Sequence, residues 1–388
     1  MIIAGGLYKE SCVVPEWNAE YGSGGRGAAA VVALSPATIL HTYSPTPDSS
    51  GLNALRRLGV DVHVHLATHG VAFAYFHPLS NPHIEPPRSS IVQHPPIEVS
   101  GEAVLRFGFL EGDAIVKANR AVYDPQTSVR SVEFGANGSH AEELALVLNE
   151  GEARALSGNG DMREAALTLL QPGGAAVVVI KAGARGALVA ERVGTMTEVP
   201  AYRSERVFKI GTGDVFSSMF ALEWAERKQP PAVAADLASR SVADYCSSGR
   251  LPLPTNTPSR REPILLKCQP VVLLEGAIDT IGRRYVMEEA RYSLAELGAI
   301  VVCPALDPTP SVAHGPISSA LVIADAASGS LRSQVQRLAD AGIPVVLLDE
   351  LRSSTALARK AKPPRLTTID DFASAIYFAL WAASLQPN

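Results

Sequence analysis

The chain has 388 residues, of which 47% are hydrophobic and 19% are charged. A chain of this length exceeds what one core usually organises, so it favours two domains, and the hydrophobic fraction excludes a disordered protein. The net charge of -5, without a long basic run, argues against a nucleic-acid-binding protein and favours a small molecule as the partner.

The first residues, Met1-Ile2-Ile3-Ala4, are typical of a short strand and not of a charged signal sequence. No apolar stretch approaches the roughly 20 residues that cross a bilayer. We therefore expect a cytoplasmic protein without a membrane partner. The cysteines form no CxxC pair, so we expect reduced core thiols and neither a zinc site nor disulfides. They are Cys12, Cys246, Cys268 and Cys303.

A glycine-rich segment, Gly24-Gly25-Arg26-Gly27, leads into the alanine-rich run Ala28-Ala29-Ala30. Such a turn before a helix lets the backbone approach a ligand closely, although glycines at this position also serve packing alone. Further along, the segment from His77 to Pro96 is rich in proline and histidine. Its histidine spacing fits no metal-ligand motif, so a loop or lid over a substrate is the better interpretation.

The run Leu144–Leu148 is typical of a strand, and Asn149-Glu150-Gly151-Glu152 follows it. Asn149 and Glu152, three positions apart at a helix start, share one face of the helix. They can hold water, Mg²⁺ or phosphate, or they can simply cap the helix.

A buried strand is predicted over residues 175–180, and Lys181, Gly183 and Gly186 follow it. These glycines permit a tight hairpin beside a nucleotide, but a hairpin needs glycine in any case.

The most informative motif is Gly211-Thr212-Gly213-Asp214, which opens an apolar stretch of helical spacing. Glycines ahead of a helix let backbone N–H groups converge on an anion, and the aspartate is placed to take a proton beside it. This arrangement indicates phosphoryl transfer.

Residues 250–264 concentrate prolines and polar residues, and a new strand-helix pattern begins after them. We therefore predict a domain over residues 1–249, a linker over 250–264 and a second domain over 265–388. Short β-branched runs alternate with helical patterns in both parts, which indicates the α/β class. The strands expected in the second domain are 271–274, 300–302 and 345–348.

In this order and spacing, the motifs of residues 1–248 resemble the PfkB family of carbohydrate and nucleoside kinases, which includes ribokinase and adenosine kinase. The resemblance implies a ribokinase-like, doubly wound sheet. It implies that Asp214 deprotonates the acceptor hydroxyl, while the amides of Gly211, Thr212 and Gly213 form an anion hole for the transferred phosphate. It further implies that Asn149 and Glu152 organise Mg²⁺ and its waters, and that Lys181, Gly183 and Gly186 border ATP.

For the acceptor site, the resemblance implies Gly24, Gly25 and Glu10, where Glu10 replaces the family's early aspartate. Other positions also depart from the family. Ala29 replaces an asparagine, Gln126 replaces the asparagine of an Asp-Pro-Asn strand end, and Phe208-Lys209 replaces Asp-Thr before the first glycine. These departures favour an alternative, a catalytically degenerate nucleotide-binding sensor or regulatory protein.

Two rival chemistries lack their motifs. The sequence has no Gly-x-x-x-x-Gly-Lys-Ser/Thr, which argues against a P-loop kinase, and no convincing Gly-x-Ser-x-Gly elbow of a hydrolase.

The second domain, over about residues 269–348, resembles the nucleoside 2-deoxyribosyltransferase family and so implies a smaller Rossmann-like fold. Gln334 stands where that family has its glutamate nucleophile, and an amide cannot serve as one. Gly329-Ser330 keeps a trace of the family's Ser-Gly-Thr loop. We predict a nucleotide-binding or oligomerising module. Asp279, Arg283 and Asp325 can support a ligand there, although charged residues at a strand end or on a helix face are more often solvated. An N-glycosidase using Asp279 or Asp325 is a further alternative.

The leading prediction is therefore an ATP- and Mg²⁺-dependent kinase that phosphorylates a primary hydroxyl of a sugar or nucleoside. The presence of the second domain shifts the expectation toward nucleosides, because both halves would then handle a ribose compound. A homodimer is expected, as is common in the resembled kinase family.

Overall fold

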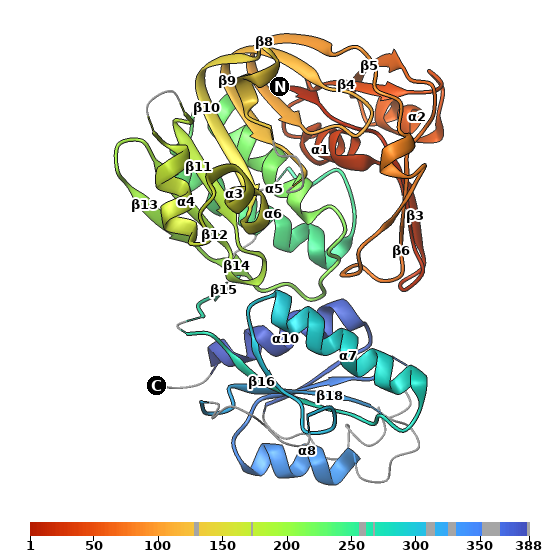
Figure 1. The fold of residues 1–388 in the computed structure, drawn as a ribbon, viewed down its shortest axis with the longest axis vertical. Helices are drawn as coiled ribbons and strands as arrows, with labels where there is room; N and C mark the ends of the chain where they lie inside the picture. Colours follow the sequence, from red (N-terminus) through yellow and green to blue (C-terminus); the bar gives the residue numbers. More distant parts are fainter. Residues whose placement is uncertain are drawn as a thin grey trace. The chain divides into compact units, whose positions relative to one another are not determined.

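The computed structural model describes residues 1–127, 132–171, 174–255, 261–266, 268–307, 315–324, 331–350 and 365–385. The chain divides into two compact units, unit 1 over Met1–Pro263 and unit 2 over Ile264–Asn388. Both units are of the α/β class (Figure 1).

Unit 1 is built around a large, mostly parallel sheet with the strand order β13-β12-β11-β10-β9-β8-β1-β4-β5. Within this sheet, and among its described strands, only the pairings of β12 with β11 and with β13 are antiparallel. The strands are β1 (Ile2–Ala4), β4 (Ile39–Ser44), β5 (Asp61–Leu66), β8 (Ile97–Phe107), β9 (Ala114–Asp124), β10 (His140–Asn149), β11 (Val177–Lys181), β12 (Ala187–Glu191) and β13 (Met196–Val199).

Helices cover both faces of this sheet because its central strands are apolar on both sides. In β11, Val177 and Val179 lie in one core cluster, while Val178 and Ile180 lie in the other. The first cluster is covered by α1 (Gly22–Val31), α2 (Ser50–Arg57), α5 (Thr212–Ala221) and α6 (Pro231–Ser248). The second is covered by α3 (Glu150–Ser157) and α4 (Met162–Leu169).

A separate four-stranded sheet, which we call the small sheet, projects from unit 1 (Figure 1). Its strand order is β3-β2-β6-β7, and β2 pairs antiparallel with β3 and parallel with β6. The strands are β2 (Lys9–Cys12), β3 (Trp17–Glu20), β6 (Ala72–Tyr75) and β7 (His83–Glu85). The segment 77–96, expected to be a loop or lid, thus contributes one strand to this sheet and the single turn η1 (Arg88–Ser90).

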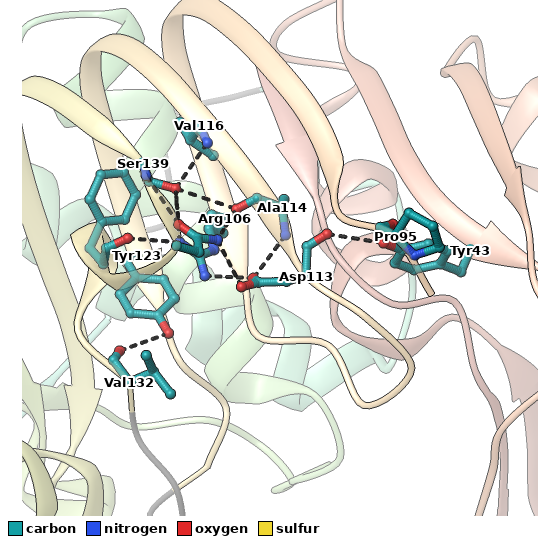
Figure 2. Close-up of polar contacts among 11 residues, drawn as sticks. Tyr43, Pro95, Arg106, Asp113, Ala114, Val116, Tyr123, Val132 and Ser139 are labelled. Carbon is teal, nitrogen blue, oxygen red and sulfur yellow. Dashed lines mark hydrogen bonds and ion pairs between the residues drawn. The ribbon is translucent and has the colours of Figure 1, made fainter. Parts of the chain in front are cut away.

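A buried arginine on β8 ties together the segments around the connection from β8 to β9 (Figure 2). Arg106 Nη2 donates to Asp113 Oδ1 at 2.5 Å, and Nη1 donates to the carbonyl of Phe134 at 3.1 Å and to Ser139 Oγ at 3.2 Å. Its guanidinium carbon lies 4.7 Å from the ring centre of Tyr123. Because the Arg106 side chain is only 3% exposed, these contacts replace its hydration.

The proline-rich segment that we expected to be a linker begins as part of unit 1. Leu253 is buried, and its amide donates to the carbonyl of Ala30 at 3.3 Å. Arg261 pairs with Asp244 on α6 at 2.7 Å. The boundary between the compact units falls between Pro263 and Ile264, at the later end of the predicted linker. Proline content alone did not indicate this packing.

Several short elements complete this part of the chain. β14 (Ala201–Tyr202) pairs with β15 (Pro263–Ile264) in a two-stranded sheet. The other short pieces are η2 (Phe134–Asn137), η3 (Gly183–Arg185) and the π-helical turn η4 (Leu222–Glu226) that extends α5.

Unit 2 contains a five-stranded parallel sheet with the order β17-β16-β18-β19-β20. In chain order this is 2-1-3-4-5, an order known from doubly wound sheets. The strands are β16 (Val271–Glu275), β17 (Ile300–Val302), β18 (Ser319–Ile323), β19 (Val345–Leu348) and β20 (Leu366–Ile369). The expected strands 271–274, 300–302 and 345–348 are confirmed.

Helices lie on both faces of this second sheet (Figure 1). α8 (Leu331–Asp340) packs on Leu273, Val322 and Leu347, while α10 (Phe372–Ala382) packs on β18 and β19 and contacts α7 (Ile281–Glu296). The last described element is η5 (Ala383–Leu385).

Three of the four cysteines are buried, namely Cys12, Cys246 and Cys303, and all four are free. Cys268 is exposed, so the prediction of a core thiol is wrong at this position. It lies between β15 and β16, where the neighbouring Leu265 is also exposed, so apolar neighbours in the sequence did not ensure burial here. None of the described helices has the length and apolarity that crossing a membrane requires.

Candidate active site

Polar residues meet where three neighbouring strands of the main sheet end. β9 ends at Asp124, β10 at Asn149 and β11 at Lys181, and Asn149 lies opposite Lys181 in the register. The start of α5 lies at the same edge, since Lys181 Nζ is 3.3 Å from Ser217 Oγ. Ligands of open α/β sheets bind at the carboxyl ends of the strands. This edge is therefore the candidate active site.

The glycine-rich segment caps α5. Gly211 has a φ of 75°, in the left-handed region that favours glycine. The amide of Thr212 donates to the carbonyl of Lys209 at 3.2 Å, so this predicted member of the anion hole already has an acceptor. Among the described residues, no hydrogen bond engages the amides of Gly211 and Gly213. Together with the positive end of the helix dipole, these two amides can bind an anion.

Asp214 lies in the first turn of α5 and is 8% exposed. Its Oδ2 accepts from Arg26 Nη1 at 3.0 Å, and its Oδ1 accepts from Gln126 Nε2 at 3.2 Å. Each carboxylate oxygen has a second lone pair that can accept a further hydrogen bond. Burial raises the pKa of Asp214 to about 6, although the positive charge of Arg26 opposes this. A carboxylate with such a pKa is suited to general base catalysis near neutral pH.

Arg26 is completely buried and bridges two carboxylates. Its Nη2 donates to Glu10 Oε2 at 2.6 Å and its Nη1 to Glu10 Oε1 at 3.2 Å, while Nη1 also reaches Asp214. A Cβ added to Gly211 would lie 2.0 Å from Arg26 Nε, so the arginine packs directly on the cap of α5. Burial disfavours the charged guanidinium, but Glu10, Tyr245 and Asp214 together outweigh this and raise the pKa of Arg26 well above its usual value.

Lys181, predicted to border the nucleotide, lies in a buried ion pair. Its Nζ is 2.6 Å from Asp124 Oδ2, and the same oxygen accepts from Ser217 Oγ at 2.6 Å. Burial disfavours the ammonium, but the carboxylates of Asp124 and Glu152 outweigh it and raise the pKa of Lys181. A Cβ on Gly213 would lie 3.7 Å from this ammonium, so its positive charge is next to the anion site.

Asn149 and Glu152 form a capping box at the start of α3. Asn149 Oδ1 accepts from the Glu152 amide at 2.9 Å, and Glu152 Oε2 accepts from the Asn149 amide at 2.8 Å. The capping interpretation of this pair is therefore realised in the structure. Burial and the negative charge of Asp124 raise the pKa of Glu152 to about 7, while Lys181 opposes the shift. The Glu152 carboxylate thus interacts with the charges of Asp124 and Lys181, and its role toward Mg²⁺ stays a prediction.

The two glycines of the hairpin between β11 and β12 both have positive φ, 56° at Gly183 and 93° at Gly186. A Cβ on Gly186 would lie 2.0 Å from the carbonyl oxygen of Val199. The predicted tight hairpin is confirmed, and close packing against the end of β13 accounts for Gly186. Contact of these glycines with a nucleotide stays a prediction.

Gly24 and Gly25 lie inside α1, which begins at Gly22, and not in a turn before it. The expectation of a turn is wrong because the first turn of α1 packs onto the residues that follow β1. A Cβ on Gly24 would lie 2.4 Å from the carbonyl oxygen of Gly5, and one on Gly25 would lie 2.8 Å from Leu7 Cδ1. Close packing accounts for both glycines, and their contact with the acceptor stays a prediction.

A second lysine lies at the start of α5. Lys209 Nζ donates to Thr212 Oγ1 at 3.0 Å, and burial lowers the pKa of this ammonium. Among the residues whose structure is described, no carboxylate forms an ion pair with it. Phe208, the other departure from the family, contacts Trp17 of β3 with ring centres 5.3 Å apart.

Sequence reasoning did not assign roles to several residues of this site. Arg26 was visible as one charged residue among glycines and alanines at the start of a helix, a position where a buried arginine must find partners. Ser217 gave no signal in the sequence. Asp124 and Gln126 were noted only as part of a strand end resembling the family pattern.

Comparison with known proteins bears on this edge of unit 1. Residues 144–243 match the family described as pfkB family carbohydrate kinase. This range contains the second half of β10 and all of α3, β11 and α5, and therefore Asn149, Glu152, Lys181 and Asp214. No curated protein sequence matches the chain.

Solved structures similar to the chain include kinases of sugars and nucleosides. Ribokinase from Arabidopsis thaliana, solved with ribose and ATP, is 13% identical, with a TM-score of 0.49, and the match covers 65% of this chain and 95% of that one. Aminoimidazole riboside kinase from Salmonella enterica is 15% identical, with a TM-score of 0.47, over 64% and 94% of the chains. A pyrophosphate-dependent kinase of the ribokinase family, complexed with a pyrophosphate analogue and myo-inositol, is 18% identical, with a TM-score of 0.46, over 66% and 98%.

The residues predicted to act in unit 2 are only partly described. Asp279 forms an exposed ion pair with Arg283 at 2.8 Å, four residues along the chain. Gln334 lies on α8, whereas Asp325, Gly329 and Ser330 lie outside the described residues. The resemblance to deoxyribosyltransferases and the N-glycosidase alternative therefore stay predictions.

Proposed function

We propose that unit 1 transfers a phosphoryl group from ATP to a hydroxyl of a sugar or nucleoside, with Asp214 as the base. The observation that supports this most is the position of the Asp214 carboxylate in the first turn of α5, beside the amides of Gly211 and Gly213. A transferred phosphate bound by these amides would lie next to the group that accepts the proton of the attacking hydroxyl.

The surrounding charges support the same assignment. Lys181 lies beside Gly213, and Lys209 donates a hydrogen bond to the side chain of Thr212. Both ammonium groups are placed to attract the phosphates of the donor and to balance the charge that develops during transfer. The family match over residues 144–243 agrees with this chemistry.

In this proposal Glu152 and Asn149 would hold Mg²⁺ through its waters, and the ion would supply positive charge against the phosphates of the donor. Carboxylate and amide oxygens are ligands that suit this ion. Asn149 also has to keep its cap on α3, since Asn149 Oδ1 accepts from the Glu152 amide at 2.9 Å. A water-mediated contact is compatible with both tasks.

The experiment that tests the proposal compares the wild-type protein with Asp214→Asn. Each protein is incubated with a panel of donor and acceptor pairs, in which the donor is ATP or pyrophosphate and the acceptor is ribose, a riboside or myo-inositol. We expect the wild-type protein to form a phosphorylated product with at least one pair. The amide cannot accept the proton, so turnover should fall by at least about a hundredfold, while nucleotide affinity measured by calorimetry stays within about twofold. Equal turnover in the two proteins would refute Asp214 as the base.

One observation favours a second candidate, a catalytically silent nucleotide-binding sensor. Arg26 already occupies one oxygen of Asp214 and is itself completely buried. In a sensor this ion pair would be a permanent part of the core. ATP binding without turnover over the whole panel would support the sensor and contradict the kinase.

A further inference from the structure

One guanidinium joins the small sheet to the proposed base. Glu10 lies on β2 of the small sheet, Arg26 on α1 and Asp214 on α5. Arg26 contacts both carboxylates, at 2.6 Å for Glu10 and 3.0 Å for Asp214. Glu10 and Asp214 are thus linked through a single side chain, although they belong to different parts of unit 1.

We propose that Arg26 is a positioning residue that couples the placement of the small sheet to the orientation of the Asp214 carboxylate. The inference rests on the proposed function only in calling Asp214 the base. The coupling itself is a property of the fold without any ligand.

Burial makes the coupling strong. The side chains of Arg26, Glu10 and Asp214 are 1%, 7% and 12% exposed. Water therefore has little access to these groups and cannot easily replace the contacts between them. If Glu10 moved away with the small sheet, Arg26 would keep a single carboxylate, Asp214, together with a long contact of 3.3 Å to the carbonyl of Gly22 and its interaction with Tyr245. A buried charge that loses its partner is costly, so displacement of the small sheet and loss of the base geometry should occur together.

Aromatic contacts reinforce the same connection. The guanidinium carbon of Arg26 lies 5.9 Å from the ring centre of Trp17 on β3 and 5.5 Å from that of Tyr21. Trp17 also contacts Phe208, close to the cap of α5, with ring centres 5.3 Å apart. The small sheet therefore contacts the start of α5 through an ion-pair chain and through an aromatic pair.

Arginine is the residue type that this task requires. Its planar fork binds Glu10 through two nitrogens and keeps a donor for Asp214. A lysine keeps the charge but offers no fork, so it cannot hold both carboxylates in a fixed geometry. Arg26→Lys is therefore the variant that separates charge from positioning.

The experiment measures amide hydrogen exchange in the ligand-free, full-length protein. The variants are Arg26→Lys and Asp214→Asn, with Asp61→Asn, an exposed carboxylate on β5, as the matched control. Asp214 has no hydrogen bond or ion pair to the small sheet except through Arg26 among the described contacts. A changed exchange rate of the amides of residues 9–12 and 17–20 in Asp214→Asn would therefore report transmission through the arginine.

We expect exchange in β2 and β3 to be faster by about tenfold in Arg26→Lys, which weakens the contact to Glu10, and unchanged in Asp61→Asn. In Asp214→Asn we expect it to be slower by about tenfold, because opening of the small sheet would then leave Arg26 without any carboxylate. The amides of β4, measured in the same samples, show whether a variant has lost its overall stability instead. Unchanged exchange of the small sheet in Asp214→Asn would overturn the coupling. Faster exchange of β4 to the same degree as β2 would also overturn it, because the effect would then be global.

Turnover gives a second, separate readout. In an active protein, Arg26→Lys should lower kcat more than it raises KM, since the base is misplaced after the acceptor has bound. Glu10→Gln should move the acid limb of the pH profile to lower pH, because the negative charge of Glu10 raises the pKa of Asp214. If no acceptor is phosphorylated, the proposed function fails, while the exchange result still decides the coupling.

Discussion

The carboxylate of Asp214 lies among groups that shift its pKa in opposite directions. Burial raises the pKa to about 6, Arg26 lowers it, and the negative charges of Glu10 and Asp124 raise it again. A base must be ionised to accept a proton, so the rate should rise as the pH increases through about 6 and level off above it. The measurement is kcat/KM against pH from 4.5 to 8. A rate that is flat between about pH 5 and 7 would contradict this prediction.

The same shift affects stability with the opposite sign. The folded-state pKa of Asp214 is raised from 3.8 to about 6. The folded state therefore holds this proton more tightly than the unfolded chain, and the contribution of Asp214 is most favourable below the unfolded pKa. It is lost as the pH rises through about 6. Unit 1 thus keeps a charge at neutral pH at a cost in stability, which is common at functional sites.

Lys209 offers a prediction about the donor. Its ammonium has a hydroxyl partner in Thr212 and no ion pair among the described residues. If it binds a phosphate of the donor, Lys209→Met should raise the KM for ATP by about ten- to a hundredfold, the value of one charge-assisted hydrogen bond. Lys117→Met, at an exposed position of β9, is the control and should leave KM unchanged. The measurement is initial rate against ATP concentration at saturating acceptor.

At the scale of elements, the Arg106 network shows how a connection between strands is held (Figure 2). Arg106 lies on β8, Asp113 lies just before β9, and Ser139 lies just before β10, where its Oγ also accepts from the Val116 amide at 3.0 Å. The network therefore fixes the approach to two neighbouring strands with one buried cation.

We expect Arg106→Met to lower the free energy of unfolding by about 2–3 kcal/mol, since several hydrogen bonds to a charged group are lost. The matched control is Arg163→Met. The Arg163 side chain is 53% exposed in its ion pair with Glu198, and such a surface pair contributes about 0–1 kcal/mol. Urea unfolding of both variants measures the difference. Similar losses for the two variants would contradict the assigned role of burial.

At the same scale, the start of α3 shows that one motif can serve two purposes. The spacing of Asn149 and Glu152 predicted either metal binding or a cap, and the hydrogen bonds show the cap. The raised pKa of Glu152 comes from burial and from Asp124, which lies at the end of the neighbouring strand. Because α3 begins where β10 ends, its capping geometry places the Glu152 carboxylate at the candidate active site.

At the scale of the whole molecule, the two compact units have separate cores. Unit 1 has clusters on both faces of its large sheet, and unit 2 has its own cluster under α8. We therefore expect two transitions in a calorimetric scan. ATP at about one hundred times its dissociation constant should raise the first unit's melting temperature by roughly 5 °C and leave the other transition unchanged. A shift of the second transition alone would place the nucleotide site in unit 2.

The sequence by itself determined the features that depend on neighbouring positions in the chain. The alternation of apolar runs with helical patterns predicted the α/β class, and strands such as 345–348 are present as expected. The glycine motif predicted the start of α5 with Asp214 in its first turn, because capping and helix propensity act over a few residues.

Only the tertiary structure decided what surrounds Asp214. The hydrogen bond between Arg26 and Asp214 joins residues 188 positions apart, and the one between Lys181 and Asp124 joins residues 57 apart. Whether a buried charge meets a partner depends on how strands and helices from distant segments approach one another, and on the burial that this approach produces. No local pattern carries that information, so Arg26 was visible in the sequence as a residue and not as the link between two carboxylates.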